Sequence, residues 1–292
     1  MDRDVANYSV EGRIGEGAHG LVFKARHIPT GREVALKKIL IKNLEDGIPI
    51  NVMREIKALQ LLRCKYGYEF GLSTGVYVLR FMGDVASQPT GTNNSARKNI
   101  LTDVAQRDAD LKPANLLINH EGILKIADLG LARLYWPDGG RPYSHQVATR
   151  WYRAPELLYG ARFYSEKIDL WSVGCIIAEM ITKKPLFAGE SDIEQLAIVL
   201  QHLGTPTEET WPGHSKLPDY HKITFPDSTP TPWSDLLPGV ESEAIDLIKS
   251  FVLYNADRRI SAKEALRHPW FHSRPPPAAI DDMPKPNINK PK

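Results

Sequence analysis

Four side chains in the first half of the chain have the types and the spacing needed to move a phosphoryl group. Lys37 can neutralise phosphate oxygens, and Asp110 can accept or orient the proton of an attacking hydroxyl. Asn115, five positions after Asp110, and Asp128 supply the hard oxygen ligands that Mg2+ prefers. Together these residues predict the transfer of the terminal phosphate of a nucleotide to a hydroxyl group.

Two short motifs contain three of these side chains. The first runs from Asp110 to Asn115 (DLKPAN), and in it Lys112 would steady the transferring phosphoryl group. The second is Asp128-Leu129-Gly130, in which Asp128 would hold the magnesium ion that bridges the phosphates. A chance pair of surface loops is the alternative. The two motifs in this order favour a functional site.

A glycine-rich segment precedes Lys37 and fits the pattern G-x-G-x-x-G-x-V. Glycines let backbone N–H groups approach phosphates closely. A dinucleotide-binding fold uses a similar string, but there the glycines open a helix, whereas the run Leu21-Val22-Phe23 predicts a strand and hence a hairpin. An ordinary glycine-rich hairpin without a ligand is the alternative. The residues expected to contact the nucleotide are Gly15, Glu16, Gly17, Ala18, His19, Gly20, Leu21 and Val22.

Lys37 ends the run VALK, which is typical of a strand lysine that contacts the α- and β-phosphates. A carboxylate must hold the ammonium group in place, and Glu55, on a predicted helix over 51–63, is the candidate. Ala35 is small enough to admit an adenine ring beside it. A solvated surface ion pair is the alternative. The distance of Lys37 from the glycine segment favours the nucleotide site.

Periodicity predicts a strand-rich first part and a helical second part. Residues 8–40 alternate apolar and polar positions around glycine turns, as in a small antiparallel sheet. Residues 75–81 predict a further strand, and 116–126 predict two short ones. A proline-rich connection covers 204–238, and six prolines from Arg274 onward predict a disordered tail. Helical spacing predicts helices over 51–63, 168–182, 191–203, 241–253 and 261–267.

Composition limits the classes of protein to which the chain can belong. With 292 residues, 42% of them hydrophobic, it can bury one large core or two lobes. Its 37 basic and 35 acidic residues leave a net charge of +2, so direct nucleic-acid binding is not expected. The apolar stretch from Leu170 to Ile181 is too short to span a bilayer, so no membrane association is expected. Cys64 and Cys175 match no metal-ligand spacing and predict reduced thiols in a cytosolic or nuclear protein.

The stretch from Ser144 to Glu156 (SHQVATRWYRAPE) resembles the activation segment of the cyclin-dependent kinase family. The later runs LLYGAR, DLWSVGC and LGTP resemble the same family. The resemblance implies an ATP-dependent enzyme that uses Mg2+ to transfer the γ-phosphoryl group to Ser or Thr of protein substrates. A non-catalytic pseudokinase that binds a nucleotide or a partner is the second class of function considered.

The resemblance also implies the α+β, bilobal protein kinase fold over residues 8–271. A small β-rich N-lobe with one regulatory helix would cover about 8–84, and a larger, mainly helical C-lobe about 85–271. Residues 272–292 would form the proline-rich tail.

The same resemblance assigns roles to individual residues. The catalytic residues would be Asp110, Lys112, Lys37 and Glu55. Besides the glycine segment, the nucleotide would contact Ile14, Ala35, Lys37 and Leu117. The metal ligands would be Asn115 and Asp128.

Residues near the activation segment would control and position the reaction. Ser144 stands where the family has an activating phosphothreonine, and a phosphate there would pair with Arg54 and Arg133. A merely solvated loop serine is the alternative for Ser144. Family members favour proline after the acceptor, because proline brings no N–H that needs a partner. Ala148 and Arg153 would line that subsite.

Three structural contacts are also implied. Thr149 would bridge Asp110 and Lys112. Glu156 would pair with Arg259, and Asp169 would brace the catalytic loop.

The helix that carries Arg54 and Glu55 corresponds to the family's cyclin-binding helix. A cyclin or cyclin-like activator is therefore expected to set the Lys37–Glu55 pair. The run from Asn51 to Glu55 differs from the sequence that is usual in this helix in the family, which leaves the identity of the activator open. The expected role is regulation of the cell cycle or the cilium. The expected compartments are the nucleus or the cytoplasm, with the cilium as a third candidate.

One stretch, about 64–109, departs from the family pattern. Asp110 follows Glu55 by 55 positions, whereas the elements of the family would need roughly 60 after the helix. Residues 86–99 contain no large apolar side chain, although a core helix needs an apolar stripe. The His-Arg before the catalytic Asp is replaced by Asp108-Ala109. These features predict a shortened isoform or misassembled gene model that lacks one core helix of the C-lobe.

Overall fold

The computed structural model describes residues 7–17, 20–38, 69–73, 76–80, 111–118, 124–126 and 149–283. The chain divides into two compact units. The first contains residues 1–89, 117–133 and 284–292, and the second contains 90–116 and 134–283. The short strand pair near residue 120 belongs mostly to the first unit.

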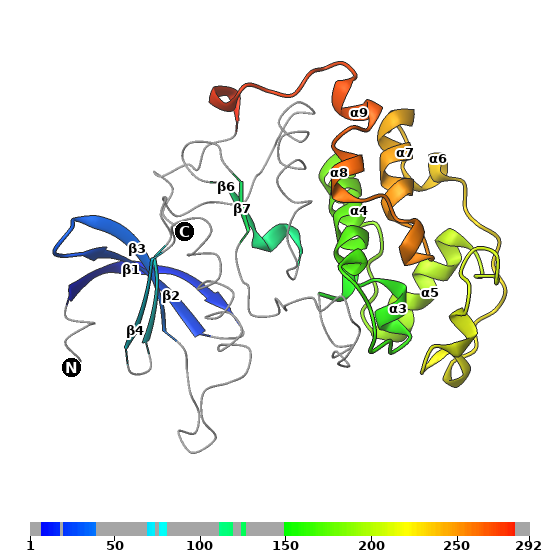
Figure 1. The fold of residues 1–292 in the computed structure, drawn as a ribbon, viewed down its shortest axis with the longest axis horizontal. Helices are drawn as coiled ribbons and strands as arrows, with labels where there is room; N and C mark the ends of the chain where they lie inside the picture. The colour runs from blue at the N-terminus through cyan, green and yellow to red at the C-terminus, as the bar shows by residue number, and fades with distance from the viewer. Residues whose placement is uncertain are drawn as a thin grey trace. The chain divides into compact units, whose positions relative to one another are not determined.

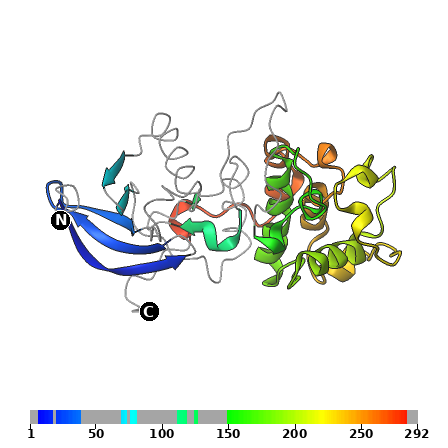
Figure 2. The same cartoon turned by 90° about the horizontal axis from the view of Figure 1, so that it is seen from below.

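The first unit contains a five-stranded sheet in which every hydrogen-bonded neighbour is antiparallel, in the order β1-β2-β3-β5-β4. Figure 2 shows β1, β2 and β3 side by side. The sheet predicted over 8–40 and the strand predicted over 75–81 are therefore confirmed. The strands are β1 (Tyr8–Gly17), β2 (Gly20–His27), β3 (Arg32–Lys38), β4 (Glu69–Ser73) and β5 (Val76–Arg80).

Alternation along β2 and β3 gives this sheet one apolar face. Ala25, Val34 and Leu36 are buried together, and Phe23 and Tyr8 pack against them. Because successive side chains of a strand point to opposite faces, the residues between these positions lie on the other face. The sequence pattern thus dictates which side of β3 carries Lys37.

The two short strands predicted within 116–126 are also present. β6 (Leu116–Ile118) pairs with β7 (Leu124–Ile126) in a sheet of two strands. The short 3-10 helix η2 (Pro113–Asn115) directly precedes β6. Proline at its first position removes an N–H that would have no partner there.

The second unit is helical and is built around α4 (Lys167–Thr182), whose middle is buried on all sides. Figure 1 shows α4 beside α7, and the two helices are in contact. The four helices predicted after residue 160 are confirmed to within a few residues of their ends. The further helices are α3 (Pro155–Leu158), α5 (Asp192–Leu203), α6 (Trp233–Leu236), α7 (Ser242–Phe251), α8 (Ala262–Ala265) and α9 (Pro269–His272).

Gly174 allows α4 to approach α7 closely. A Cβ atom added at Gly174 would lie 2.7 Å from both Phe251 Cβ and Val252 Cγ2. We therefore expect Gly174→Ala to lower the free energy of unfolding by about 1–3 kcal/mol, because the helices must move apart. Chemical denaturation measures this change. Gly12→Ala is the control, since a Cβ at Gly12 would meet nothing within 4 Å; an equal loss in both variants would contradict the packing argument.

The proline-rich connection is anchored to the helices by an aromatic cluster. Trp211 stacks on Tyr254 with ring centroids 5.2 Å apart, and Tyr159 lies 5.9 Å from Trp211. The buried Tyr254 hydroxyl donates a hydrogen bond of 2.7 Å to the carbonyl of Gly204. Burial, followed by the neighbouring Tyr159, raises the pKa of this hydroxyl well above its usual range, which keeps the donor protonated.

The predicted tail has structure in its first part. Residues 272–283 are described, Ile280–Asp282 form a 3-10 helix, and the side chain of Met283 is buried. The residues from 284 onward and the helix predicted over 51–63 lie outside the described part of the chain. Within the described part, no helix combines the length and the apolar character that crossing a bilayer requires.

Candidate active site

The register of the sheet places the predicted nucleotide residues on one face. Gly15 lies opposite Val22, and Val22 lies opposite Lys37, so the three positions form a row across β1, β2 and β3. Ala35, two residues before Lys37, lies on the same face and is 6% exposed. The face opposite the apolar core thus combines a cation, a small side chain and a glycine.

The glycine segment forms a hairpin. β1 ends at Gly17 and β2 begins at Gly20, and these two glycines are paired. The dinucleotide-binding alternative is excluded, because there the glycines open a helix rather than join two antiparallel strands. Ala18 and His19, at the turn, lie outside the described residues.

The second unit brings two predicted residues of the catalytic loop and the activation segment into contact. Lys112 Nζ donates a hydrogen bond of 2.9 Å to Thr149 Oγ1, across 37 positions of sequence. This is the contact predicted between Thr149 and Lys112. The contacts predicted for Asp110 lie outside the described residues.

Asn115 ends η2 and is 6% exposed. Its backbone N–H donates to the Lys112 carbonyl at 2.9 Å, which fixes the loop just before β6. An amide oxygen at this buried position fits the hard donor set that Mg2+ requires. Its predicted co-ligand Asp128 lies outside the described residues.

The backbone that follows Thr149 is tied to α4. Residues Arg150–Tyr152 form a 3-10 turn, and Ser172 Oγ donates to the Tyr152 carbonyl at 2.7 Å. The Tyr152 hydroxyl donates to Glu179 Oε2 at 2.7 Å. Burial, and then this bond to the carboxylate, raise the pKa of the Tyr152 hydroxyl well above its usual range. The tyrosine therefore remains a donor at any physiological pH.

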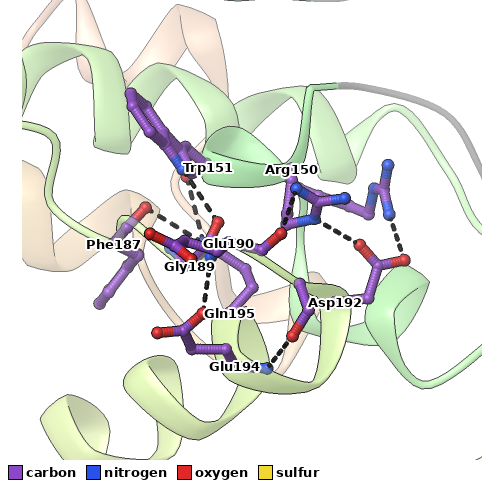
Figure 3. Close-up of polar contacts among 10 residues, drawn as sticks. Arg150, Trp151, Phe187, Gly189, Glu190, Asp192, Glu194 and Gln195 are labelled. Carbon is purple, nitrogen blue, oxygen red and sulfur yellow. Dashed lines mark hydrogen bonds and ion pairs between the residues drawn. The ribbon is translucent and has the colours of Figure 1, made fainter.

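Asp192, the first residue of α5, joins two arginines of the activation segment. Its Oδ1 accepts from Arg150 Nε at 2.8 Å, as Figure 3 shows, and its Oδ2 lies 2.8 Å from Arg153 Nη1. Arg150 Nη1 also donates to the Glu190 carbonyl at 2.9 Å. The side chain of Arg153 is 12% exposed, so this carboxylate binds a largely buried guanidinium.

The charge state of Asp192 follows from these contacts. Partial burial acts to raise the pKa of its carboxyl, but the hydrogen bond from Arg150 and the charges of both arginines outweigh burial and hold this pKa below its usual range. Because folding lowers this pKa, the ionised carboxylate stabilises the folded state at pH values above the ordinary pKa of an aspartate. This stabilisation is lost as the pH falls through the lowered pKa of the folded state. The arrangement is therefore intact at neutral pH.

Gln195 joins the segment to the start of α5 from a fully buried position. Its Nε2 donates to the Phe187 carbonyl at 3.2 Å and to the Trp151 carbonyl at 3.4 Å, while its Oε1 accepts from Gly189 N at 2.8 Å (Figure 3). Trp151 Nε1 in turn donates to the Gly189 carbonyl at 3.0 Å. A Cβ at Gly189 would clash with the backbone of Gln195, so this contact needs glycine.

The predicted pair of Glu156 and Arg259 is present and buried. Arg259 Nη1 and Nη2 reach Glu156 Oε1 and Oε2 at 2.6 and 2.7 Å, a two-pronged geometry. The pair connects α3 to the loop before α8. The contact predicted for Asp169, in the first turn of α4, is not among the described ones.

The remaining predicted site residues divide into three groups. Ile14, Leu21 and Leu117 are half-buried in β1, β2 and β6. For Glu16, Gly17 and Gly20 the structure describes the backbone only. The predicted residues outside the described part are Ala18, His19, Arg54, Glu55, Asp110, Asp128, Arg133, Ser144 and Ala148.

Two residues of the site, Asp192 and Gln195, did not emerge from the motifs. Both lie in the first turn of α5, whose start the sequence marks by Ser191, which caps the helix by accepting from Glu194 N at 3.1 Å. The cap determines where the helix begins, but no spacing of residues in the sequence indicates that this helix start contacts Arg153. The contact arises only when α5 packs near Arg150–Tyr152.

Comparison with known proteins extends these observations. The family model described as protein kinase domain matches residues 106–271. The chain is 50% identical over 301 residues to cyclin-dependent kinase 20 of Danio rerio and 48% identical over 303 residues to that of Homo sapiens. Each match covers 96% of this chain and 87% of the relative. Cyclin-dependent kinase B2-1 of Oryza sativa subsp. japonica is 39% identical over 290 residues, which is 89% of this chain and 88% of the relative.

These matches confirm the predicted α+β protein kinase fold, with its β-sheet first part and helical second part. They also imply the use of ATP and Mg2+ that is general to the family. The chain belongs to the protein kinase family, and within it to the cyclin-dependent serine/threonine kinases.

Proposed function

We propose that this kinase phosphorylates Ser or Thr followed by proline. The supporting observation is the fixed position of Arg153, whose guanidinium is mostly buried and bound by Asp192 at 2.8 Å. A proline that follows the phosphorylated Ser or Thr has no backbone N–H. A subsite lined by Arg153 and the predicted Ala148 therefore does not have to supply a hydrogen-bond acceptor for that residue. Residues with a free N–H would bury an unpaired donor there, which costs binding energy.

Each predicted site residue would have its own role in binding ATP or in transferring its γ-phosphoryl group. Lys37 would hold the α- and β-phosphates of ATP over the sheet face that contains Gly15, Val22 and Ala35. Asn115, with Asp128, would hold Mg2+, which supplies positive charge to the phosphates when bound. Asp110 would orient the substrate hydroxyl and accept its proton, and Lys112 would stabilise the charge on the moving phosphoryl group.

Phosphate transfer to paired peptides tests this function. The purified chain should phosphorylate a Ser-Pro peptide and a Thr-Pro peptide well above their Ser-Ala and Thr-Ala counterparts. Lys37→Met and Asp110→Asn should each abolish transfer. Equal rates on the proline and alanine peptides would reject the proline preference, and transfer that survives Asp110→Asn would reject the assigned catalytic loop.

Asp192→Asn should reduce the preference for Ser-Pro over Ser-Ala. The variant keeps the shape of the side chain but removes the negative charge that faces Arg153. Because the Asp192 side chain is 47% exposed, solvent screens the pair, and the loss should be about 0.5–1 kcal/mol. We therefore expect a drop of roughly two- to fivefold in the ratio of the kcat/KM values, whose logarithm measures transition-state binding.

The control for this variant is Arg150→Gln, which leaves the bond between Asp192 and Arg153 in place and should change the ratio little. The wild-type ratio should also be constant from pH 6 to pH 9, because the lowered pKa of Asp192 keeps its carboxylate ionised there. A ratio that changes equally in both variants would mean that Arg153 is not the specificity element.

The kinase is also expected to act on protein substrates under a cyclin or cyclin-like activator. The activator would bind the predicted helix over 51–63 and set the Lys37–Glu55 pair, and phosphate on Ser144 would bind Arg54 and Arg133. Regulation of the cell cycle or the cilium, in the nucleus, the cytoplasm or the cilium, is the cellular role that follows. Copurification from cells followed by imaging of the tagged chain tests both proposals.

A pseudokinase form is the second candidate. The alignment with the Danio rerio relative is 301 residues long, but it includes only 96% of this chain, or about 280 of its 292 residues. About 21 aligned positions of the relative therefore have no counterpart in this chain. The family model also begins matching only at residue 106, near the end of the altered stretch. Suppose that the wild type, Lys37→Met and Asp110→Asn all fail equally to phosphorylate peptides while MgATP still raises the melting temperature of the wild type. That result would show that the chain acts as a nucleotide-binding pseudokinase rather than as an enzyme.

A further inference from the structure

Proline-directed acceptor sequences occur within this chain itself. The sequence contains three Thr-Pro pairs and no Ser-Pro pair. All three lie in the proline-rich connection 204–238, at Thr205-Pro206, Thr229-Pro230 and Thr231-Pro232.

The fold brings the three pairs together at the end of α5. Thr205 N donates to the Ser228 carbonyl at 2.9 Å, and Ser228 N donates to Thr205 Oγ1 at 2.8 Å. Thr231 N donates to the carbonyl of His202, in the last turn of α5, at 2.9 Å. Backbone contacts therefore hold the segment on both sides of Thr229.

Two of the three threonines are poor acceptors for a kinase. Thr205 is half-buried, its hydroxyl already accepts a hydrogen bond, and Pro206 after it is buried. Thr231 is also half-buried, and its Oγ1 donates to the Gln201 carbonyl at 3.3 Å. Phosphorylation of either would require these contacts to break first.

Thr229 differs from both. Its side chain and the following Pro230 are exposed, and among the residues that the structure describes its hydroxyl makes no hydrogen bond. The run from Ile223 to Pro232 belongs to no helix or strand, so the backbone can extend into a kinase cleft without unwinding an element. The bonds of Ser228 and Thr231 are the main contacts to be opened locally.

We propose that Thr229 is a phosphorylation site and that a second copy of this kinase modifies it. The proposal rests on the proline-directed function above. Thr229 Oγ would form a bond to the γ-phosphorus of ATP while the bond from that phosphorus to the β,γ-bridging oxygen breaks. ADP leaves, and the hydroxyl proton passes to a carboxylate of the donor molecule, for which Asp110 is the candidate.

The test uses the full chain as both enzyme and acceptor. Asp110→Asn protein, expected to be inactive, is incubated with catalytic amounts of wild type, MgATP and, in a parallel reaction, a Thr-Pro peptide. Mass spectrometry should find phosphate on Thr229 of the inactive acceptor, and Thr229→Val in that acceptor should remove it. Peptide phosphorylation by Thr229→Val enzyme should equal that of the wild type.

Thr205→Val sharpens the test, because it removes the acceptor for Ser228 N and loosens the segment. Loss of one ordinary hydrogen bond should make local opening, and hence Thr229 phosphorylation, about five times faster. Peptide phosphorylation without phosphate on Thr229 would overturn the proposal and leave the proposed function standing. If the peptide and Thr229 are both unmodified, the proposed function and this proposal are overturned together.

Discussion

Replacing Arg259 with leucine should lower the free energy of unfolding by about 3–5 kcal/mol, because it leaves a buried carboxylate without its partner. The side chain of Arg259 is fully buried, and that of Glu156 is 10% exposed. Arg259 also donates to the carbonyls of Leu253 and Lys167, both at 2.9 Å, and its guanidinium lies 5.2 Å from the centroid of the Trp171 ring. Denaturant unfolding of the variant measures the loss.

The double variant Glu156→Leu with Arg259→Leu separates charge from packing. Removing both partners leaves no unpaired charge in the interior, so we expect it to recover a large part of the lost free energy. Glu156→Leu alone should also destabilise, since it leaves the guanidinium unpaired. A loss below about 1 kcal/mol for Arg259→Leu would contradict the buried pair as a major structural contact.

Most of the architecture follows from local sequence signals. Alternation around glycine turns predicted the first three strands, and helical spacing predicted α4, α5, α7 and α8. At the start of α8, Ser261 and Glu264 form a reciprocal capping box, which is itself a local signal. These signals act over a few residues, and for that reason they can be recognised without knowledge of the fold.

Contacts that join distant segments divide into two kinds. Those between Lys112 and Thr149 and between Glu156 and Arg259 were predicted, because motifs shared with a family fix both partners. Those of Asp192 and Gln195 were not predicted, since their positions depend on how α5 packs near Arg150–Tyr152. In the first part of the predicted tail, composition does not reveal that Met283 finds a buried position.

Lys112→Met should lower kcat for peptide phosphorylation about 100- to 1000-fold with little loss of stability. The ammonium group is predicted to stabilise charge that develops on the phosphoryl group, and removing one preorganised donor from such a site typically costs this much. Methionine keeps the length of the side chain, and Lys112 is only half-buried, so the melting temperature should change little. Steady-state kinetics at saturating MgATP measures the effect.

Thr149 provides the matched control, because its Oγ1 accepts the hydrogen bond of 2.9 Å that orients Lys112 Nζ. Thr149→Val keeps the ammonium but removes this one hydrogen bond, so kcat should fall only about 5- to 15-fold, the equivalent of one hydrogen bond of about 1–1.5 kcal/mol. Thr149→Ser retains the hydroxyl and should stay close to wild type. If Lys112→Met keeps more than a third of the wild-type kcat, Lys112 does not act on the transferring group, and its contact with Thr149 is structural.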